Sequence, residues 1–217
     1  MKVIYEDNHI IVVEKASGDI VQGDKTGDTP LSDIVKAYIK EKYAKPGNVF
    51  LGVVHRLDRP VSGLVVFART SKALSRLNEM FRKGEVHKVY WALVQGHPQQ
   101  QSATLRNFLI RNEKQNKSYV VNTGREGEAK EAVLRYSVIE PLDNYSLLEV
   151  ELLTGRHHQI RCQLSNIGHP IKGDLKYGAR RSNPDGSISL QAHSISFLHP
   201  VSKQPLTFSL PDHNPFF

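Results

Sequence analysis

Cysteine is nearly absent from this sequence of 217 residues, since Cys162 is the only one. A single thiol cannot form a disulfide within the chain, which indicates a reducing compartment. Long apolar runs are also missing, and no stretch approaches the roughly 20 residues of a transmembrane helix. The first residues, MKVIYEDNHIIVVEK, are charged throughout and contain no apolar segment typical of a secretory signal. We therefore expect a cytoplasmic protein that makes no membrane contact.

Several catalytic signatures are missing as well. The sequence has no His-Glu-x-x-His motif and no pair of cysteines, and the adjacent His157 and His158 would diverge on a helix. The residues around Ser62, VSGL, lack the Gly-x-Ser-x-Gly turn of many hydrolases, and no Walker-type phosphate loop is present. We therefore predict no metal site, no serine-hydrolase chemistry and no nucleotide-phosphate loop.

Positive charge is present in excess and is unevenly distributed. The chain has 29 lysines and arginines against 22 aspartates and glutamates, a net charge of +7. The segment from His55 to Ala92 contains eight basic residues and only three acidic ones. The basic residues are Arg56, Arg59, Arg69, Lys72, Arg76, Arg82, Lys83 and Lys88. This local excess favours a polyanionic partner, although a solvated basic helix face would give the same pattern.

The apolar pattern predicts more strands than helices and indicates an α+β fold with a mixed, mostly antiparallel central sheet flanked by helices and loops. Strands are expected over residues 3–5, 10–14, 87–96, 130–140, 144–154, 187–197 and 205–210. Helices are expected over 30–43, with Asp28 or Thr29 as the cap, and over 71–83, ending at Gly84. The polar stretch 111–131 is expected to be mainly loop. No repeat or flexible linker is visible, so residues 1–217 are expected to form one domain.

The segment GVVHRLDRPVSGLVVFA, residues 52–68, holds two apolar runs that are typical of strands. The connection between them carries one carboxylate, Asp58, between Arg56 and Arg59. Glycoside hydrolysis normally uses two carboxylates, and Asp58 has no acidic companion nearby in the sequence. From these residues alone, Asp58 is either a turn or surface ion-pair residue or a lone catalytic carboxylate that works beside a polyanion.

The segment LLTGRHHQIRCQLSNIGHPIKGD, residues 152–174, predicts a short helix that opens with Arg156, His157 and His158 and ends at Gly168. Cations at a helix N-terminus meet the positive end of the macrodipole, which costs about 0.3–1 kcal/mol each. Such a helix start suggests a counter-anion. The anion is either the carboxylate of Asp58 or a bound phosphate; the remaining alternative is that Arg156 extends into solvent.

HRLDRPVSGLVVFART resembles the catalytic motif of the RluA family of RNA pseudouridine synthases, His-Arg-Leu-Asp followed after two residues by Thr/Val-Ser-Gly-Leu. VIYEDNHIIVVEK is similar to the family's N-terminal hairpin and HKVYWALVQG to its Lys-x-Tyr-x-Ala motif. LLTGRHHQIRCQLSNIGHPIKGD resembles its Thr-Gly-Arg-x-His-Gln-Ile-Arg block, and LQAHSISFLHPVS its closing His-Pro strand. The resemblance runs in order from Val3 to Pro211.

The resemblance implies a pseudouridine synthase fold and the isomerisation of uridines to pseudouridine in structured RNA, ribosomal or transfer, without a cofactor. It implies that Asp58 is the catalytic carboxylate, that Tyr90 stacks on a flipped-out base, and that Arg156 pairs with Asp58. Asp58 could attack the base, attack the sugar carbon or abstract a sugar proton. The residues expected to bind RNA or substrate are Arg56, His55, Arg59, Lys88, His158 and Arg161. No obligatory protein partner is expected, and a monomer is the default.

The sequence departs from the family pattern at two positions, because Ala16 stands where members usually have proline and Val61 where many have threonine. Many relatives carry a small RNA-binding domain before the catalytic one, whereas this chain is expected to consist of the catalytic part alone. Two other functions remain open. One is a non-catalytic RNA-binding module, which would have no need of Asp58, Tyr90 and Arg156 together. The other is an aspartate-dependent hydrolase of nucleosides, for which a second carboxylate is missing.

Overall fold

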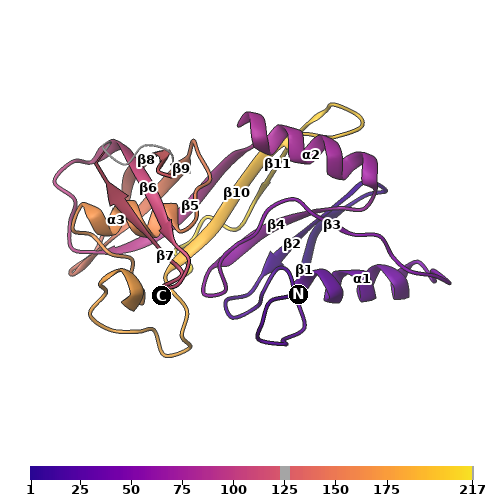
Figure 1. Cartoon of the computed structure of the whole chain (residues 1–217), viewed down its shortest axis with the longest axis horizontal. Helices are drawn as coiled ribbons and strands as arrows, with labels where there is room; N and C mark the ends of the chain where they lie inside the picture. Colours follow the sequence, from indigo (N-terminus) through magenta and orange to yellow (C-terminus); the bar gives the residue numbers. More distant parts are fainter. Residues whose placement is uncertain (123–127, 217) are drawn as a thin grey trace. The chain divides into compact units, whose positions relative to one another are not determined.

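The computed structural model describes residues 1–122 and 128–216 and divides into two compact units (Figure 1). Unit 1 comprises Met1–Val86 and Ser194–Leu210. Unit 2 comprises His87–His193 and Pro211–Phe217. The expectation of one domain over residues 1–217 stays a prediction.

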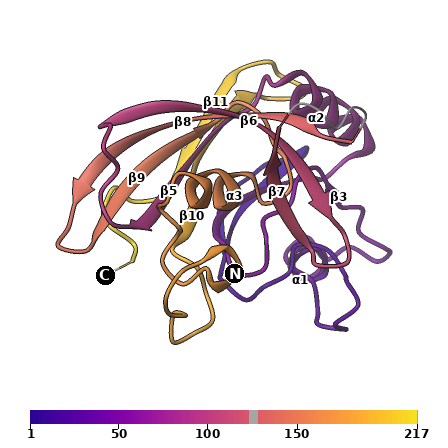
Figure 2. The same ribbon diagram turned by 60° about the vertical axis from the view of Figure 1, so that its left-hand side comes forward.

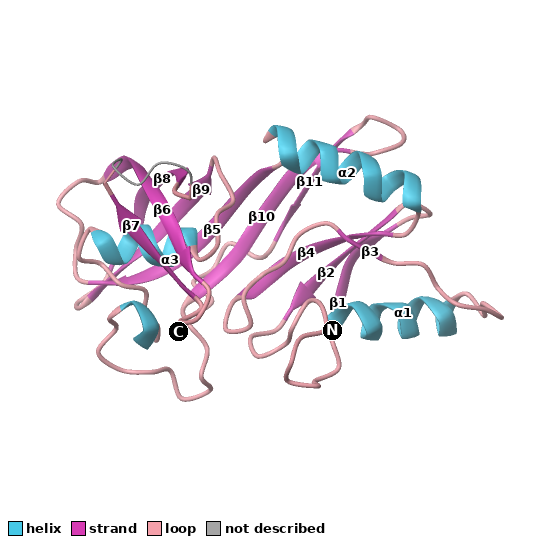
Figure 3. Ribbon diagram, in the orientation of Figure 1, coloured by secondary structure: helices cyan, strands magenta, loops and turns pink. Residues whose placement is uncertain are grey.

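Unit 1 is built on a small sheet with one helix on each face. Its strands are β1 (Lys2–Glu6), β2 (Ile10–Lys15), β3 (Gly52–Val53), β4 (Ser62–Ala68), β11 (Pro205–Ser209) and the second half of β10 (Leu190–Leu198). The order is β1-β2-β4-β10, with β3 paired to β4 and β11 paired to β10. The β1–β2, β2–β4, β3–β4 and β10–β11 pairs are all antiparallel. Helices α1 (Leu31–Lys42) and α2 (Ser71–Lys83) lie on opposite faces of this sheet (Figures 1 and 3).

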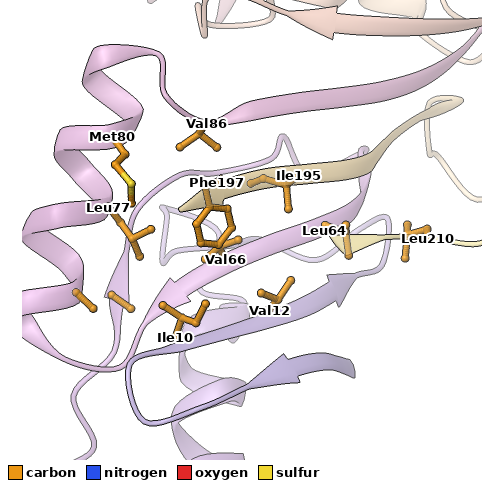
Figure 4. Packing of buried hydrophobic residues seen from close by; sticks show 12 residues of the cluster. Ile10, Val12, Leu64, Val66, Leu77, Met80, Val86, Ile195, Phe197 and Leu210 are labelled. Carbon is orange, nitrogen blue, oxygen red and sulfur yellow. The ribbon is translucent and has the colours of Figure 1, made fainter. Parts of the chain in front are cut away.

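The core of unit 1 forms because alternate strand residues point to opposite faces of the sheet. Figure 4 shows Leu77 and Met80 of α2 pointing toward the sheet residues Val66 and Phe197. Ile10, Val12 and Leu64 continue the same apolar layer and are 1% exposed or less, and Phe197 is 5% exposed. Leu64 and Val66 belong to β4, so this layer holds in place the strand that follows the connection with Asp58.

Both predicted helices of unit 1 are present, with a difference at the start of α1. For α2, the predicted bounds and the cap at Gly84 are confirmed, since Gly84 has φ 73°. For α1, neither Asp28 nor Thr29 caps the helix, and Pro30 precedes it with no side-chain cap. Instead, the backbone N–H groups of Leu31 and Ser32 donate to carbonyls of a neighbouring loop at 2.7 and 3.1 Å. Tertiary backbone contacts therefore replace the expected cap.

Unit 2 contains an antiparallel sheet with the order β5-β9-β8-β6-β7, next to the first half of β10. The strands are β5 (His87–Gln95), β6 (Ser102–Asn112), β7 (Lys117–Val121), β8 (Lys130–Pro141) and β9 (Tyr145–Leu152). Helix α3 (Gln159–Asn166) lies against one face of this sheet, and a short 3-10 helix, η1 (Leu175–Tyr177), follows it (Figure 2). The predicted α+β class with a mostly antiparallel sheet is confirmed.

The expectation of a loop over residues 111–131 is wrong in its described part. Strand β6 extends to Asn112, β7 covers Lys117–Val121, and β8 begins at Lys130. Strands β6 and β7 pair from Asn112 opposite Lys117 to Phe108 opposite Val121. The sequence hid this hairpin because its side chains are mostly exposed or half-buried, so that backbone pairing and not an apolar pattern defines it. Residues 123–127, also within the expected loop, lie outside the described residues.

Candidate active site

Asp58 lies in the connection between β3 and β4 of unit 1. The two strands pair antiparallel, with Val53 opposite Phe67. Asp58 is half-buried, and its backbone carbonyl accepts a hydrogen bond from the N–H of Val61 at 3.0 Å, which closes a turn. Leu57 and Val61 are 7% and 3% exposed. Because both flanking side chains are buried, the carboxylate is carried by an anchored turn.

Lys15, at the end of β2, holds this turn in place. Its side chain is fully buried, with 0% exposure. The ammonium donates hydrogen bonds to the carbonyl oxygens of Val61 at 2.6 Å, Ala16 at 3.0 Å and Arg59 at 3.1 Å. These three acceptors match the three donors of an ammonium group. Gly18, with φ 92°, also donates its N–H to the Arg59 carbonyl at 2.9 Å, so the turn after β2 is joined directly to the Asp58 turn.

Lys15 should make the stability of the protein depend on pH in the alkaline range. Burial lowers its pKa to about 8, although the negative charges of Asp19 and Asp58 oppose the shift. Between pH 8 and 10.5 the unfolded chain binds a proton here that the folded chain has lost, so unfolding becomes harder as pH rises. We expect the free energy of unfolding of the wild type to rise, relative to that of Lys15→Met, by about 3 kcal/mol over this range.

Urea denaturation of both proteins at several pH values measures this difference. The comparison with Lys15→Met cancels the contributions of other groups that titrate at high pH. A difference that stays constant from pH 8 to 10 would show that folded Lys15 keeps its proton over this range, which would contradict the lowered pKa.

Two arginines flank Asp58 and differ in their surroundings. Arg59 donates to the carboxylate of Asp28 at 2.7 Å and to the hydroxyl of Thr26 at 2.8 Å. It therefore ties the loop after β2 to the turn, and RNA would have to compete with this ion pair for its guanidinium. Arg56 is exposed. Of the two, Arg56 is the better placed to contact a ligand.

His55 has a structural role at the start of the connection. Its Nε2 accepts a hydrogen bond from the backbone N–H of Val66 in β4 at 3.0 Å. The ring also stacks on Phe81 of α2, with ring centres 5.0 Å apart. An acceptor at Nε2 fixes the neutral tautomer with its proton on Nδ1. The structure thus supports a loop-orienting role for His55.

Unit 2 brings Lys88, Tyr90 and the Arg156 segment to neighbouring strands. Lys88 and Tyr90 lie on the same face of β5, and Tyr90 is 9% exposed. Lys88 pairs with Leu152 of β9, and Gly155 and Arg156 follow Leu152 by three and four residues. A Cβ atom placed on Gly155 would lie 3.5 Å from the Nζ of Lys88. The ammonium of Lys88, whose pKa is lowered by burial, therefore lies beside the segment that carries Arg156.

The predicted helix start at Arg156 is wrong, because α3 begins at Gln159. Its N-cap is His158, which has the left-handed value φ 52°. The Oε1 atom of Gln159 accepts hydrogen bonds from the N–H of Arg156 at 3.0 Å and from the hydroxyl of Thr154 at 2.8 Å. These bonds favour a turn over another turn of helix. Arg156 thus lies outside the first turn, where the dipole acts weakly, and the helix start by itself requires no counter-anion.

The side chain of Arg156 is exposed and directed by one hydrogen bond. Its Nε donates to the backbone carbonyl of Glu131 in β8 at 2.8 Å. Nε is the inner nitrogen of the guanidinium, so this bond orients the group without using the two terminal nitrogens. Arg156 also lines a pocket with Lys130, Gly155 and His157. An oriented, exposed guanidinium beside a pocket suits the binding of a carboxylate or a phosphate.

His158 was expected to bind RNA, but it is 9% exposed and bonded within unit 2. The hydroxyl of Tyr177 accepts a hydrogen bond from the backbone N–H of Ser118 at 2.8 Å. The same hydroxyl lies 3.0 Å from the Nδ1 of His158. Burial, with the nearby charge of Arg161, lowers the pKa of His158 to about 2. A neutral ring that accepts at Nδ1 fits this arrangement. His158 therefore links β7, η1 and the start of α3.

Arg161 was also expected to bind RNA, and it too lies in the interior. Its Nε and Nη2 donate to the two carboxylate oxygens of Asp174 at 2.7 and 2.8 Å. The side chains are 6% and 1% exposed. The guanidinium also lies over the ring of Tyr177, 5.1 Å from its centre. This paired, buried cation positions α3 against the segment that follows it and presents little surface to RNA.

Removing the carboxylate of Asp174 should strongly destabilise the protein. Breaking a buried ion pair leaves an uncompensated charge, which costs about 3–5 kcal/mol. We therefore expect Asp174→Asn to lower the free energy of unfolding by about that amount in urea denaturation. Asp185→Asn removes an exposed carboxylate of the same unit and should change it by less than about 0.5 kcal/mol. Equal effects of the two variants would contradict the structural role of the pair.

The expected site residues thus fall into two groups. His55, Arg56, Asp58 and Arg59 share one connection in unit 1, and Lys88, Tyr90 and Arg156 lie on neighbouring segments of unit 2. The expected meeting of Asp58 with Tyr90 and Arg156 joins residues of different units and stays a prediction.

Sequence reasoning missed three buried residues, Lys15, Asp174 and Tyr177. Strand alternation could have found Lys15, since it shares a strand face with the buried Ile11 and Val13. No comparable pattern indicates Asp174, whose partner lies 13 residues away across a helix and a loop.

Neither a metal cluster nor a membrane-spanning helix is present among the described residues. Among them, no group of three or more His, Cys, Asp and Glu side chains is arranged to hold a metal ion. No described helix is both long enough and apolar enough to span a membrane.

Solved structures and curated proteins show what this chain is similar to. The human RNA pseudouridylate synthase domain containing 4 superposes with a TM-score of 0.82 at 23% identity, over 97% of this chain and 88% of that one. This likeness confirms the fold. Ribosomal large subunit pseudouridine synthase D of Zymomonas mobilis is 33% identical over 96% of this chain and 68% of its own length. Ribosomal large subunit pseudouridine synthase C of Vibrio vulnificus is 33% identical over 96% of this chain and 65% of its own length.

The chain therefore spans about two thirds of the length of these curated relatives. Residues 9–166 match the family model of RNA pseudouridylate synthases. That range includes Asp58, Tyr90 and Arg156. The motifs that carry Asp58 and Tyr90 therefore lie within the range that matches this family. The chain belongs to the RNA pseudouridine synthases, with a catalytic domain of the RluA type.

Proposed function

We propose that this protein converts specific uridines of ribosomal RNA to pseudouridine, with Asp58 as the catalytic carboxylate. One observation carries the proposal. In a chain of this family, the carboxylate of Asp58 lies on a turn whose carbonyl groups are held by the fully buried Lys15. Preorganisation of this kind is what a catalytic group needs and a surface turn does not. The names of the two curated relatives favour large-subunit ribosomal RNA over transfer RNA as substrate.

The proposed reaction is an isomerisation that needs no co-reactant. The bond from sugar C1′ to base N1 breaks, the base turns, and a bond from C1′ to C5 forms. N1 gains one proton and C5 loses one, so the composition of the RNA is unchanged. Asp58 acts at the base or the sugar, and Tyr90, on the strand beside Lys88, stacks on the uracil ring near C5.

Reaching the uridine requires its extrusion from folded RNA, at a cost of a few kcal/mol. Arg56, exposed and two residues before Asp58, fills the vacated space or pairs with the orphaned base. Once the base covers the site, the Asp58 carboxylate loses hydration. Arg156, through the terminal nitrogens that its bond to Glu131 leaves available, supplies the positive charge that keeps the carboxylate ionised.

Basic side chains on α2 provide sequence-independent contacts to the RNA backbone. Lys72 and Arg82 on this helix make no ion pair or hydrogen bond with a described residue, whereas Lys83 pairs with Glu79 at 2.9 Å. Free cations of this kind release counterions on binding RNA, so affinity should fall as salt rises. The protein is further proposed to act as a cytoplasmic monomer.

One assay tests the function. The protein is incubated with a large-subunit ribosomal RNA transcript that carries tritium at uridine C5, and tritium release into water is followed. The expected result is release with no free uracil. Binding without release would indicate an RNA-binding module, and liberated uracil would indicate a hydrolase; either outcome would overturn the proposal.

A further inference from the structure

A pocket of unit 2, distinct from the Arg156 pocket, is lined by cationic side chains on turns. It has a volume of about 680 Å³. Its walls come from the turn after β5, the β8–β9 turn, the end of α3 and the segment after η1. The side chains that matter for its charge are those of His97, Asp143, His169, Arg180 and Arg181.

Positive charge dominates this pocket. Arg180 and Arg181 are both exposed, and neither makes an ion pair or hydrogen bond with a described residue. Asp143 is the one carboxylate among the lining residues and is also exposed. Two adjacent arginines without a carboxylate partner are poorly explained by stability, because structural arginines such as Arg161 are paired. They are well suited to a phosphate, which a guanidinium binds through two parallel hydrogen bonds.

A second part of the pocket wall carries no arginine and consists of histidines and backbone. Hydrogen bonds fix the position of this part. The Nδ1 of His97 lies 3.1 Å from the hydroxyl of Ser146, which donates to the Gly96 carbonyl at 3.0 Å. The Nδ1 of His169 donates to the carbonyl of Gln95 at 2.8 Å. Gly96 has φ 72°, and a Cβ there would lie 3.6 Å from the His169 ring. The pocket thus has a hydrogen-bonded polar wall and two exposed guanidinium groups, a combination that suits a phosphate group.

We propose that the pocket between His97, His169, Arg180 and Arg181 binds a phosphodiester of the substrate RNA. The inference rests on the proposed function for the identity of the polyanion. The site adds affinity without touching the reacting base, so its loss raises KM and leaves kcat unchanged. Asp143 limits the affinity by repelling the same phosphate.

The test measures RNA affinity as a function of salt. Binding of the large-subunit ribosomal RNA transcript is measured from about 50 to 200 mM salt for the wild type, R180Q, R181Q, the double variant and D143N. Each lost phosphate contact reduces the steepness of log affinity against log salt by about 0.7–0.9, so the double variant, which loses the one phosphodiester, should change by about that amount. Its affinity near 150 mM salt should fall about three- to tenfold. D143N should bind more tightly than the wild type.

Arg135→Gln is the matched control, because it removes one guanidinium of the same unit that is already paired with Glu151 at 3.3 Å. It should leave affinity and slope close to those of the wild type. A double variant that behaves like Arg135→Gln would overturn this inference while leaving the proposed function intact. Tritium release from the same RNA is measured in parallel. If the wild type neither binds nor modifies the transcript, the proposed function itself fails.

Discussion

Replacing Asp58 by asparagine is expected to abolish tritium release from uridine C5 while RNA binding persists. The two side chains have nearly the same shape, so the turn held by Lys15 should keep its geometry. Asparagine can neither attack as a carboxylate nor accept a proton as a base. The loss should reach about a thousandfold or more, the scale on which essential nucleophiles and general bases act. Affinity for the RNA should stay within about threefold, since one neutralised acid in a basic surface weakens no phosphate contact.

Asp19→Asn is the matched control for this experiment. Asp19 and Asp58 both act on the charge of Lys15, so either substitution changes the electrostatic surroundings of the buried ammonium. Asp19→Asn should retain activity within about twofold, as expected of a residue outside the chemistry. Activity retained in Asp58→Asn, or lost equally in both variants, would show that Asp58 serves the fold and not the reaction.

Replacing Arg156 by alanine is expected to have the second largest effect. Turnover should fall by at least about a hundredfold, on the scale seen when one electrostatic stabiliser is removed from an active site. Affinity for the RNA should fall much less. Turnover falls because the Asp58 carboxylate, once enclosed by the bound base, is ionised only at high cost when no cation is near. Single-turnover rates with saturating protein separate this loss from any change in binding.

Arg106→Ala is the control for Arg156→Ala. Arg106 is an exposed arginine that pairs with the side chain of Glu131, whose backbone carbonyl orients Arg156. Its loss removes the same charge from the same region and should leave turnover within about twofold. If Arg156→Ala instead weakened RNA binding as strongly as neutralising Lys72 and Arg82 on α2, Arg156 would be a phosphate contact.

Much of the fold could be predicted because local and tertiary preferences agree in most elements. Helix α2 shows this best: Thr70 caps its start through a hydrogen bond to Ala73, and Gly84 ends it in the left-handed conformation. The strands β2 and β4 were visible as apolar runs, and β5 as a strictly alternating pattern. Asp58 became a candidate because it lies between two arginines in a motif that resembles that of the family, and its catalytic role stays a prediction.

The features that sequence reasoning predicted wrongly depend on tertiary contacts, which the identity of single residues does not indicate. The β6–β7 hairpin is polar and is defined by backbone pairing, and α3 starts late because the side chain of Gln159 binds the backbone of Arg156. Arg161 and His158 looked like RNA ligands because sequence alone does not show burial. Their partners, Asp174 and Tyr177, approach only after the chain has folded back past α3.

The hydrogen bond from Lys15 to the carbonyl of Val61 also has a consequence for the order of folding. These residues are 46 positions apart, and the whole of α1 lies between them in the chain. A newly made chain must close this long loop before the ammonium can reach the carbonyls of Arg59 and Val61, and contacts between residues far apart in the sequence form more slowly than local ones. The Asp58 turn therefore gains its final setting only when β2 pairs with β4, where Lys15 lies opposite Gly63, so molecules in which only the helices have formed should be inactive.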